Sequence, residues 1–157
     1  MTAFAEPIVA PQPAAAVRPP RHCVLVVDDD PTICEVLATR LEHQGFRTLK
    51  CGRGIEGLAL ARQERPSLVV LDIRLPDIDG LAVCEVLADD PETCAIPVII
   101  LSGQEDPDLV RRCRAAGCHS FLHKPYDPNA LLTLIRHAIG EAGAWRGHDL
   151  CDGSWEG

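Results

Sequence analysis

Short apolar runs recur along the chain and are separated by longer segments with helical spacing. Runs of this length, apolar at nearly every position, are typical of parallel strands that are covered by helices on both faces. The sequence predicts five such strands, at Cys23–Val27, Phe46–Lys50, Leu68–Leu71, Pro97–Leu101 and Ser120–Leu122.

Apolar residues in the intervening segments follow the i, i+3, i+4 spacing of helices that lie on a sheet. One stripe consists of Ile33, Val36, Leu37 and Leu41, and another of Leu131, Leu134, Ile135, Ala138 and Ile139. An aspartate that caps a helix, followed by proline in its first turn, predicts helix starts at Asp30-Pro31, Asp106-Pro107 and Asp127-Pro128. Glycine is typical just after a helix, which predicts helix ends at Gly45 and Gly117.

Strict alternation of five strands with five helices predicts an α/β fold, a doubly wound (βα)5 flavodoxin-like sandwich. We expect a parallel sheet with strand order 2-1-3-4-5. The Ala- and Pro-rich residues 1–20 are interpreted as a disordered arm, residues 21–142 as the domain, and residues 143–157 as a C-terminal tail.

Polar residues follow the predicted strands where each of them ends. Asp28-Asp29 follow the first strand, Asp72 the third, Ser102 the fourth and Lys124 the fifth. The carboxyl ends of parallel strands share one edge of a sheet, which is where ligands bind. The pattern therefore predicts a pocket of three carboxylates, one hydroxyl and one ammonium, which suits a divalent cation and a phosphoryl group.

Composition narrows the classes of function. The 157 residues suffice for one domain, and a net charge of −8 argues against a general nucleic-acid surface. The eight cysteines contain no Cys-x-x-Cys pair, and Cys23, Cys34, Cys84 and Cys113 lie in apolar stretches, so we interpret them as buried thiols. Neither a secretory signal nor an apolar run long enough to cross a bilayer is found in the sequence, which favours a cytoplasmic protein without membrane contact.

Four segments, VLVVDDDP, LVVLDIRLPDIDG, VIILSG and FLHKPY, occur in an order and at spacings that resemble the receiver domain of two-component response regulators. The resemblance extends from Arg21 to about Ile139 and is to the single-domain, chemotaxis-regulator-like type. It implies that Asp72 accepts a phosphoryl group as a nucleophile. The protein would then be a phosphoacceptor with self-catalysed phosphorylation and dephosphorylation rather than an enzyme acting on other substrates.

The resemblance also implies a bound Mg²⁺, for which Mn²⁺ can substitute. Asp29, Asp72 and the backbone carbonyl of Arg74 would be direct ligands, and Asp28 would act through a water molecule. Mg²⁺ prefers oxygen ligands and keeps several waters.

In the family the lysine and the serine contact the phosphoryl oxygens, and the peptide bond after the lysine is typically cis. Lys124 and Ser102 occupy these positions, and Ser102 would move with an aromatic residue of the fifth strand, here Phe121, in the switch. Tyrosine is common at that position, so its replacement by phenylalanine affects how the output face is read. Arg74 and Gln104 would border the phosphoryl group.

The implied partners are a histidine kinase or a histidine phosphotransfer protein, and a downstream protein bound through the fourth and fifth helices and the strand between them. Arg111, Arg112 and Arg114 lie on or beside that face. The resemblance implies no direct nucleic-acid partner and leaves a homodimer open.

Two alternatives compete with this interpretation. A haloacid-dehalogenase-like phosphatase would use Asp28, Asp30 and Thr32 as its first motif, with Ser102 and Lys124 further on, but only Asp149 and Asp152 could supply its later acidic pair. The other is a receiver-like interaction module that works without phosphorylation.

Other candidate residues are interpreted as structural. Asp30 would be a helix cap, and Asp77 and Asp79-Gly80 would shape a turn and start the next helix. The six histidines lack metal-ligand spacing, and His148, Cys151 and Asp152 form a weak candidate metal site in the tail.

Overall fold

The computed structural model describes residues 21–144. The predicted arm, residues 1–20, and the candidate metal ligands His148, Cys151 and Asp152 lie outside the described residues. Within the described part, the strands are β1 (Cys23–Val27), β2 (Arg47–Cys51), β3 (Leu68–Asp72), β4 (Val98–Ser102) and β5 (Ser120–His123). The helices are α2 (Pro31–His43), α3 (Gly54–Glu64), α4 (Gly80–Asp89), α5 (Leu109–Ala115) and α6 (Pro128–Ala144).

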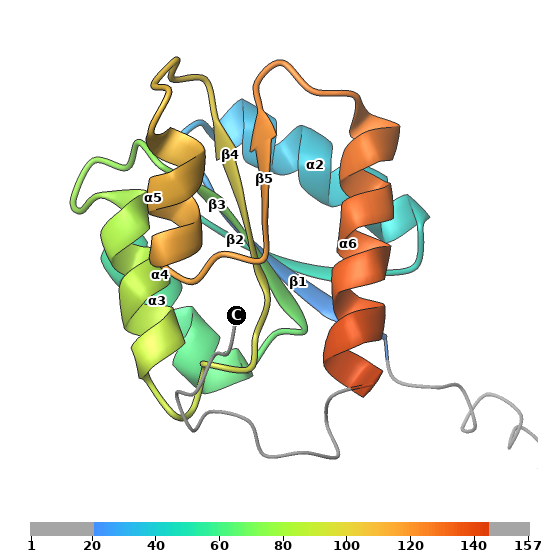
Figure 1. Ribbon diagram of the computed structural model, residues 1–157. Coiled ribbons are helices and arrows are strands. Elements are labelled where there is room, and N and C mark those ends of the chain that lie inside the picture. Colours follow the sequence, from blue (N-terminus) through green and yellow to red (C-terminus); the bar gives the residue numbers. More distant parts are fainter. Residues whose placement is uncertain (1–20, 145–157) are drawn as a thin grey trace, which may run out of the picture.

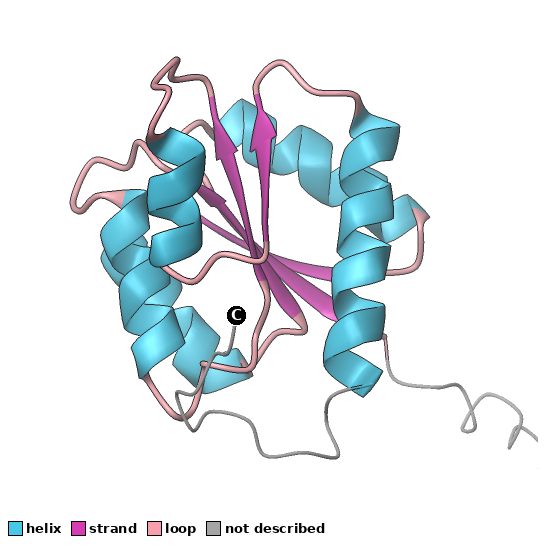
Figure 2. Ribbon diagram, viewed as in Figure 1, coloured by secondary structure: helices cyan, strands magenta, loops and turns pink. Residues whose placement is uncertain are grey.

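The five strands form one parallel sheet in the order β2-β1-β3-β4-β5, which confirms the predicted fold. Helices cover both of its faces and produce a three-layer sandwich (Figures 1 and 2). Helices α3, α4 and α5 lie on one face, and α2 and α6 lie on the other. The chain changes direction across the sheet between β1 and β3, so their carboxyl ends meet at the switch point of the fold.

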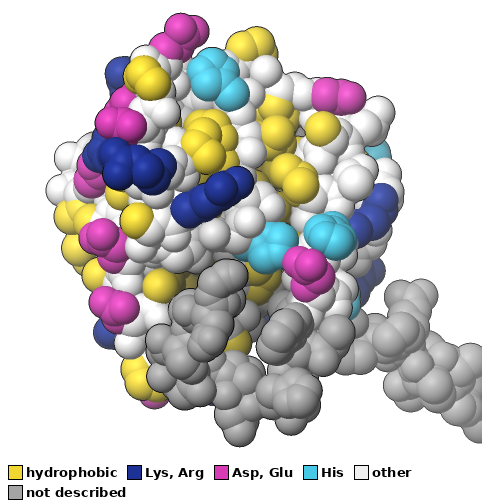
Figure 3. Space-filling model, viewed as in Figure 1, with side chains coloured by type: hydrophobic (Ala, Val, Ile, Leu, Met, Phe, Trp, Pro, Cys, Tyr) yellow, Lys and Arg dark blue, Asp and Glu magenta, His cyan; other side chains and the backbone are white. Residues whose placement is uncertain are grey.

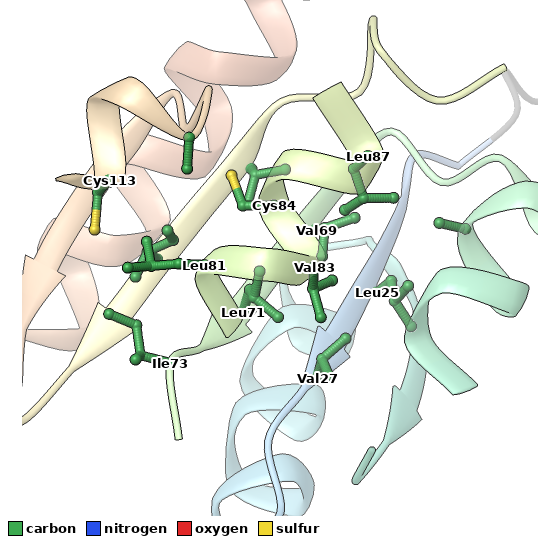
Figure 4. Packing of buried hydrophobic residues seen from close by; sticks show 14 of the residues in the cluster. Leu25, Val27, Val69, Leu71, Ile73, Leu81, Val83, Cys84, Leu87 and Cys113 are labelled. Carbon is green, nitrogen blue, oxygen red and sulfur yellow. The ribbon is translucent and has the colours of Figure 1, made fainter. Parts of the chain in front are cut away.

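Each face of the sheet has its own hydrophobic core. Alternate strand residues such as Leu25 and Leu71 pack with Leu81 and Val83 of α4 on one face (Figure 4). The opposite set, including Val26 and Val70, packs with Leu37 of α2 and Ile135 of α6. Because both faces are covered, β1, β3 and β4 are buried at every position, which explains their continuous apolar sequence.

The stripe predicted on the last helix is confirmed, but one position of the first stripe is wrong. Val36 is 56% exposed, whereas Leu37 and Leu41 are buried together with Cys34 and Ala38. A helix turns by about 100° per residue, so a face centred on Leu37 and Leu41 directs position 36 away from the sheet.

Two of the three predicted helix starts are confirmed. The carboxylate of Asp30 caps α2 by accepting a hydrogen bond from the Thr32 N–H at 2.9 Å, and Asp127 accepts one from the Asn129 N–H ahead of α6. The start at Asp106-Pro107 is wrong, because α5 begins at Leu109. Asp106 instead forms a tight turn, since its carboxylate accepts a hydrogen bond from the Asp108 N–H and its carbonyl accepts one from Leu109.

Gly45 and Gly117 have φ angles of +94° and +97°, which confirms that helices end there in a conformation that suits glycine. All four cysteines that were interpreted as buried thiols, Cys23, Cys34, Cys84 and Cys113, are buried. Burial raises the pKa of Cys84 and of Cys113 to about 12, so both remain protonated thiols at neutral pH. Among residues 21–144 no helix has the length and apolar character needed to span a bilayer.

Candidate phosphoacceptor site

The polar residues predicted to converge do meet at the carboxyl edge of the sheet. In the register, Val27 pairs with Leu71 and Asp72 pairs with Leu101, so Asp28 follows β1 beside the end of β3. Ser102 ends β4 and pairs with His123, which places Lys124 one residue beyond the end of β5. Parallel pairing across β1, β3, β4 and β5 therefore gathers side chains from four separate parts of the sequence.

Three carboxylates form the centre of the site, and we call Asp28, Asp29 and Asp72 the acidic pocket. One ligand oxygen from each of them lies within 4.8 Å of the other two. Asp28 and Asp72 are buried, and Asp29 is exposed. Receiver domains bind Mg²⁺ at an acidic cluster of this kind, and three carboxylates with one side open to solvent fit a hard divalent cation that retains water.

Lys124 supplies the positive charge of the site. Its Nζ lies 3.1 Å from Oδ2 of Asp72 and 3.3 Å from Oδ2 of Asp28. The backbone N–H of Lys124 donates to the carbonyl of Ser102 at 2.8 Å, and the Lys124-Pro125 peptide bond is cis, as the resemblance to receiver domains implied. A single ammonium thus bridges the two buried carboxylates.

Backbone hydrogen bonds orient three of the side chains in the same way. Asp28 accepts from the N–H of Asp30 at 3.0 Å, Asp72 from that of Arg74 at 3.1 Å, and Ser102 from that of Gln104 at 3.0 Å. Each acceptor is therefore held by the residue two positions further on, in the turn that follows its strand. These bonds use one oxygen of each carboxylate, and the other oxygen of each faces Lys124.

Burial and charge act against each other in this site. Burial raises the pKa of Asp28 above its ordinary value of 3.8, and the neighbouring Asp72 adds to this, although the Asp30 N–H and Lys124 favour the charged form. Burial alone would lower the pKa of Lys124, but the carboxylates of Asp28 and Asp72 outweigh that effect and raise it. The lysine therefore stays charged. Ionisation of Asp28 is unfavourable because the carboxylate is buried beside Asp72, and a bound cation would make it more favourable.

The loop after β3 is anchored at both of its ends. The Gly80 N–H donates to the carbonyl of Ile73 at 2.8 Å, and Asp79 caps α4 by accepting from the Leu81 N–H at 2.8 Å, as predicted. A Cβ on Gly80 would lie 2.4 Å from the carbonyl oxygen of Asp72. The loop therefore closes directly against the backbone of the proposed phosphoacceptor.

Asp77 has a role that sequence reasoning missed. It was interpreted as a turn residue, but its carboxylate accepts hydrogen bonds from the N–H groups of Gly54 at 2.8 Å and Ile55 at 2.9 Å, at the start of α3. These bonds lower the pKa of Asp77. Helix α3 begins after Arg53, whose side chain makes no cap hydrogen bond. A helix start without a local capping residue needs an acceptor from elsewhere in the chain, and this could have pointed to Asp77.

The remaining predicted residues lie beside the pocket, in the core or on helices α2 and α5. Arg74 is exposed, and with Gln104 it lines a groove beside the loop after β3. Phe121 is partly buried and packs against the core formed with α3, α4 and α5. Asp30 is exposed, and its carboxylate caps α2, as predicted. Arg111 and Arg112 are exposed on α5 and pair with Asp108 and Asp106.

Comparison with known proteins agrees with this geometry. The family model described as the response regulator receiver domain matches residues 24–136. Protein PilH of Pseudomonas aeruginosa is 39% identical over 116 residues, which cover 74% of this chain and 96% of PilH. The polar-differentiation response regulator DivK of Brucella anthropi is 33% identical over 119 residues, covering 76% of this chain and 97% of DivK.

A solved structure gives the same result for the fold. The CheY-like response regulator receiver domain protein of Methanospirillum hungatei superimposes with a TM-score of 0.75 at 26% identity, covering 80% of this chain and 98% of that one. The matched segment contains all the residues of the acidic pocket together with Ser102 and Lys124. The chain belongs to the response regulator receiver domain family and is a two-component signalling protein rather than a haloacid-dehalogenase-like phosphatase.

Proposed function

We propose that this receiver domain accepts a phosphoryl group on Asp72 from the phosphohistidine of a histidine kinase or of a histidine phosphotransfer protein. The observation that carries the proposal is the position of Lys124, whose ammonium bridges Asp72 and Asp28 within the acidic pocket. In the transfer, an Asp72 oxygen bonds to phosphorus as the phosphorus–nitrogen bond of the donor breaks. The electron pair of that bond returns to the donor imidazole, which takes up a proton.

Each neighbouring residue has a defined task in this reaction. Lys124 offsets the charge of the phosphoryl oxygens, and the hydroxyl of Ser102 donates a hydrogen bond to one of them. Asp28, Asp29, Asp72 and the backbone carbonyl of Arg74 would hold Mg²⁺ or Mn²⁺, with Asp28 acting through water. The bound cation supplies positive charge between an anionic nucleophile and an anionic phosphoryl group. We assign the chain no catalytic activity toward other substrates.

The signal would leave through the face formed by α5, β5 and α6. Ser102 lies at the end of β4 beside β5, and Phe121 of β5 packs against the core on the α5 side. A hydroxyl drawn toward the phosphoryl group would free space into which Phe121 moves, and this shifts the population of conformations at the face. A downstream protein, or a second copy of the chain in a homodimer, would read that change. We place the domain at residues 21–142, in the cytoplasm.

Phosphorylation with a small donor tests the proposal. In the presence of Mg²⁺, acetyl phosphate or beryllofluoride should change the amide spectrum of the wild type around Asp72, Ser102 and Phe121. Asp72→Asn should abolish the change, and the matched control Asp30→Asn, which alters only an exposed cap, should retain it. Ser102→Ala should keep the phosphate and lose the response at Phe121.

Two outcomes would contradict the proposal. An equal response in the wild type and Asp72→Asn would remove Asp72 from the reaction. A wild type that binds Mg²⁺ but responds neither to small donors nor to beryllofluoride would indicate an interaction module that works without phosphorylation.

A further inference from the structure

A second cluster of ligand-type side chains lies where β5 begins, at the opposite end of the sheet from the acidic pocket. We call His119, His137 and Glu141 the histidine–glutamate cluster. Nε2 of His119 lies 2.6 Å from Oε1 of Glu141, and Nε2 of His137 lies 3.3 Å from Oε2 of the same carboxylate. The two imidazole rings lie edge to face with centroids 6.3 Å apart. Histidine and acidic side chains gather on this face of the molecule (Figure 3).

The backbone and a neighbouring hydroxyl hold His119 in place. The backbone N–H of His119 donates to the carbonyl of Val98 at 2.8 Å, and the ring nitrogen Nδ1 lies 2.8 Å from the hydroxyl of Ser120. The His119 side chain is only 26% exposed. A hydrogen bond at one ring nitrogen fixes the orientation of the ring and leaves the other nitrogen to face a ligand, as in most histidines that bind metal.

The other two members of the cluster come from α6 and can adjust. His137 and Glu141 are four residues apart, so they share one face of the helix. Their side chains are 63% and 47% exposed, and both can change rotamer without disturbing the core. Each imidazole contacts a different oxygen of Glu141, and the ligand atoms of the three side chains do not all lie within 4.8 Å of one another as those of the acidic pocket do. A shared ion would therefore require His137 and Glu141 to turn toward the fixed imidazole of His119.

We propose that His119, His137 and Glu141 form a binding site for a divalent transition-metal ion such as Zn²⁺. Imidazole nitrogen and carboxylate oxygen are ordinary Zn²⁺ ligands, and three protein ligands leave one position for water. Binding replaces the contacts of both rings with Glu141 by metal–nitrogen and metal–oxygen bonds, and any proton carried by an imidazole nitrogen passes to solvent. The ligand type separates this site from the all-oxygen acidic pocket, which favours Mg²⁺.

Occupancy of the site has a mechanical consequence. His119 directly precedes β5, and the other two ligands lie on α6, so a bound ion would tie together two of the three elements of the proposed output face. The cluster contains no residue of the acidic pocket. Zinc binding at this cluster therefore does not depend on whether Asp72 is phosphorylated.

Zinc titration of the full chain, with excess Mg²⁺ present to occupy the acidic pocket, tests the proposal. Histidine side-chain resonances should show one site, with shifts confined to His119 and His137. His119→Gln and His137→Gln should each weaken Zn²⁺ binding by about 100-fold or more, and Ser120→Ala should weaken it about 10- to 100-fold by releasing the ring. The control His22→Gln, which removes an exposed histidine that likewise contacts a serine hydroxyl, should leave binding unchanged.

Circular dichroism of each variant establishes that it remains folded. Zinc binding that survives both His119→Gln and His137→Gln would overturn the proposal by locating the ion at a thiol or at the acidic pocket. So would a titration in which the His119 and His137 resonances do not move.

Discussion

The ammonium group of Lys124 lies 3.1 Å from the carboxylate of Asp72, although 52 positions of sequence separate the two residues. The same ammonium lies 3.3 Å from Asp28, so one lysine neutralises part of the charge on both buried carboxylates. The ammonium group thus lies against the same carboxylate oxygens that a bound cation would contact, close to where a phosphoryl group on Asp72 would be. If Asp72 accepts a phosphoryl group as proposed, Lys124 would compete with the cation before the transfer and stabilise the phosphoryl oxygens during it.

Lys124→Gln should accordingly raise the affinity for Mg²⁺ and lower the rate of phosphorylation. Mg²⁺ binding should tighten roughly tenfold because a competing positive charge is gone. Phosphorylation of Asp72 by acetyl phosphate should slow about 100-fold, as is typical when one charge-stabilising donor is removed. Calorimetry and the rate of phosphate incorporation measure the two effects. Lys50→Gln, which removes an exposed lysine paired with Glu35, is the control and should change neither. Weaker Mg²⁺ binding with an unchanged rate would contradict this account.

The pKa of Asp28 predicts how stability depends on pH. Burial raises that pKa above 3.8, so between 3.8 and its raised value the folded protein holds a proton that the unfolded chain has lost. Stability without Mg²⁺ should therefore fall as pH rises through this interval, and Asp28→Asn should remove that part of the fall. Urea unfolding at a series of pH values gives the difference between the variant and the wild type.

Asp90 provides a control of opposite sign for this experiment. Hydrogen bonds from the Glu92 N–H and from Arg62 lower its pKa, so its contribution to stability is present above 3.8 and is lost as pH falls. In Asp90→Asn the stability should no longer fall as the pH is lowered through the pKa of Asp90. In Asp28→Asn the stability should no longer fall as the pH is raised through the pKa of Asp28. Equal pH profiles for both variants would show that burial does not control Asp28.

The loop that carries Asp77 should depend on its contact with α3. Asp77→Ala removes the acceptor for the N–H groups of Gly54 and Ile55, so their amide hydrogens should exchange about tenfold faster or more. Asp79→Ala, which uncaps α4, is the matched control and should instead expose the amide of Leu81. Phosphorylation of Asp72 should slow for Asp77→Ala, because the Asp77 carboxylate holds the loop after β3 against the start of α3. Unchanged exchange at Gly54 would mean that water replaces the cap.

Two glycines should respond oppositely to alanine. Gly80→Ala would place a Cβ 2.4 Å from the carbonyl oxygen of Asp72 and 2.7 Å from Cα of Ile73, so it should destabilise the fold by about 3 kcal/mol or more. Gly140 lies exposed on α6 with nothing within 4 Å of an added Cβ. Gly140→Ala should therefore stabilise the protein by about 0.5–1 kcal/mol. Urea denaturation measures both, and a mild effect at Gly80 would show that the loop can move away from Asp72.

Several features could be predicted from the sequence because they depend on local pattern. Strands buried on both faces require continuous apolar residues, and their parallel pairing brings Asp28, Asp72 and Ser102 to one edge whatever the details of packing. The four segments that resemble receiver domains indicated the family. They also placed Lys124 at the position of the lysine that contacts the phosphoryl group in that family. The chemistry of the pocket could therefore be inferred before any coordinate was known.

Contacts between distant segments depended on the tertiary structure. The interaction of Asp77 with Gly54 spans 23 positions and that of His119 with Glu141 spans 22, and neither pair carries a local signal, because each depends on how a helix packs against the sheet. The exposure of Val36 was also decided by the rotation of α2 on the sheet. The sequence by itself determined which residues end the strands, through periodicity. Only the packed helices decided which loop caps which helix and which histidines meet, since such contacts are set by distances in space rather than along the chain.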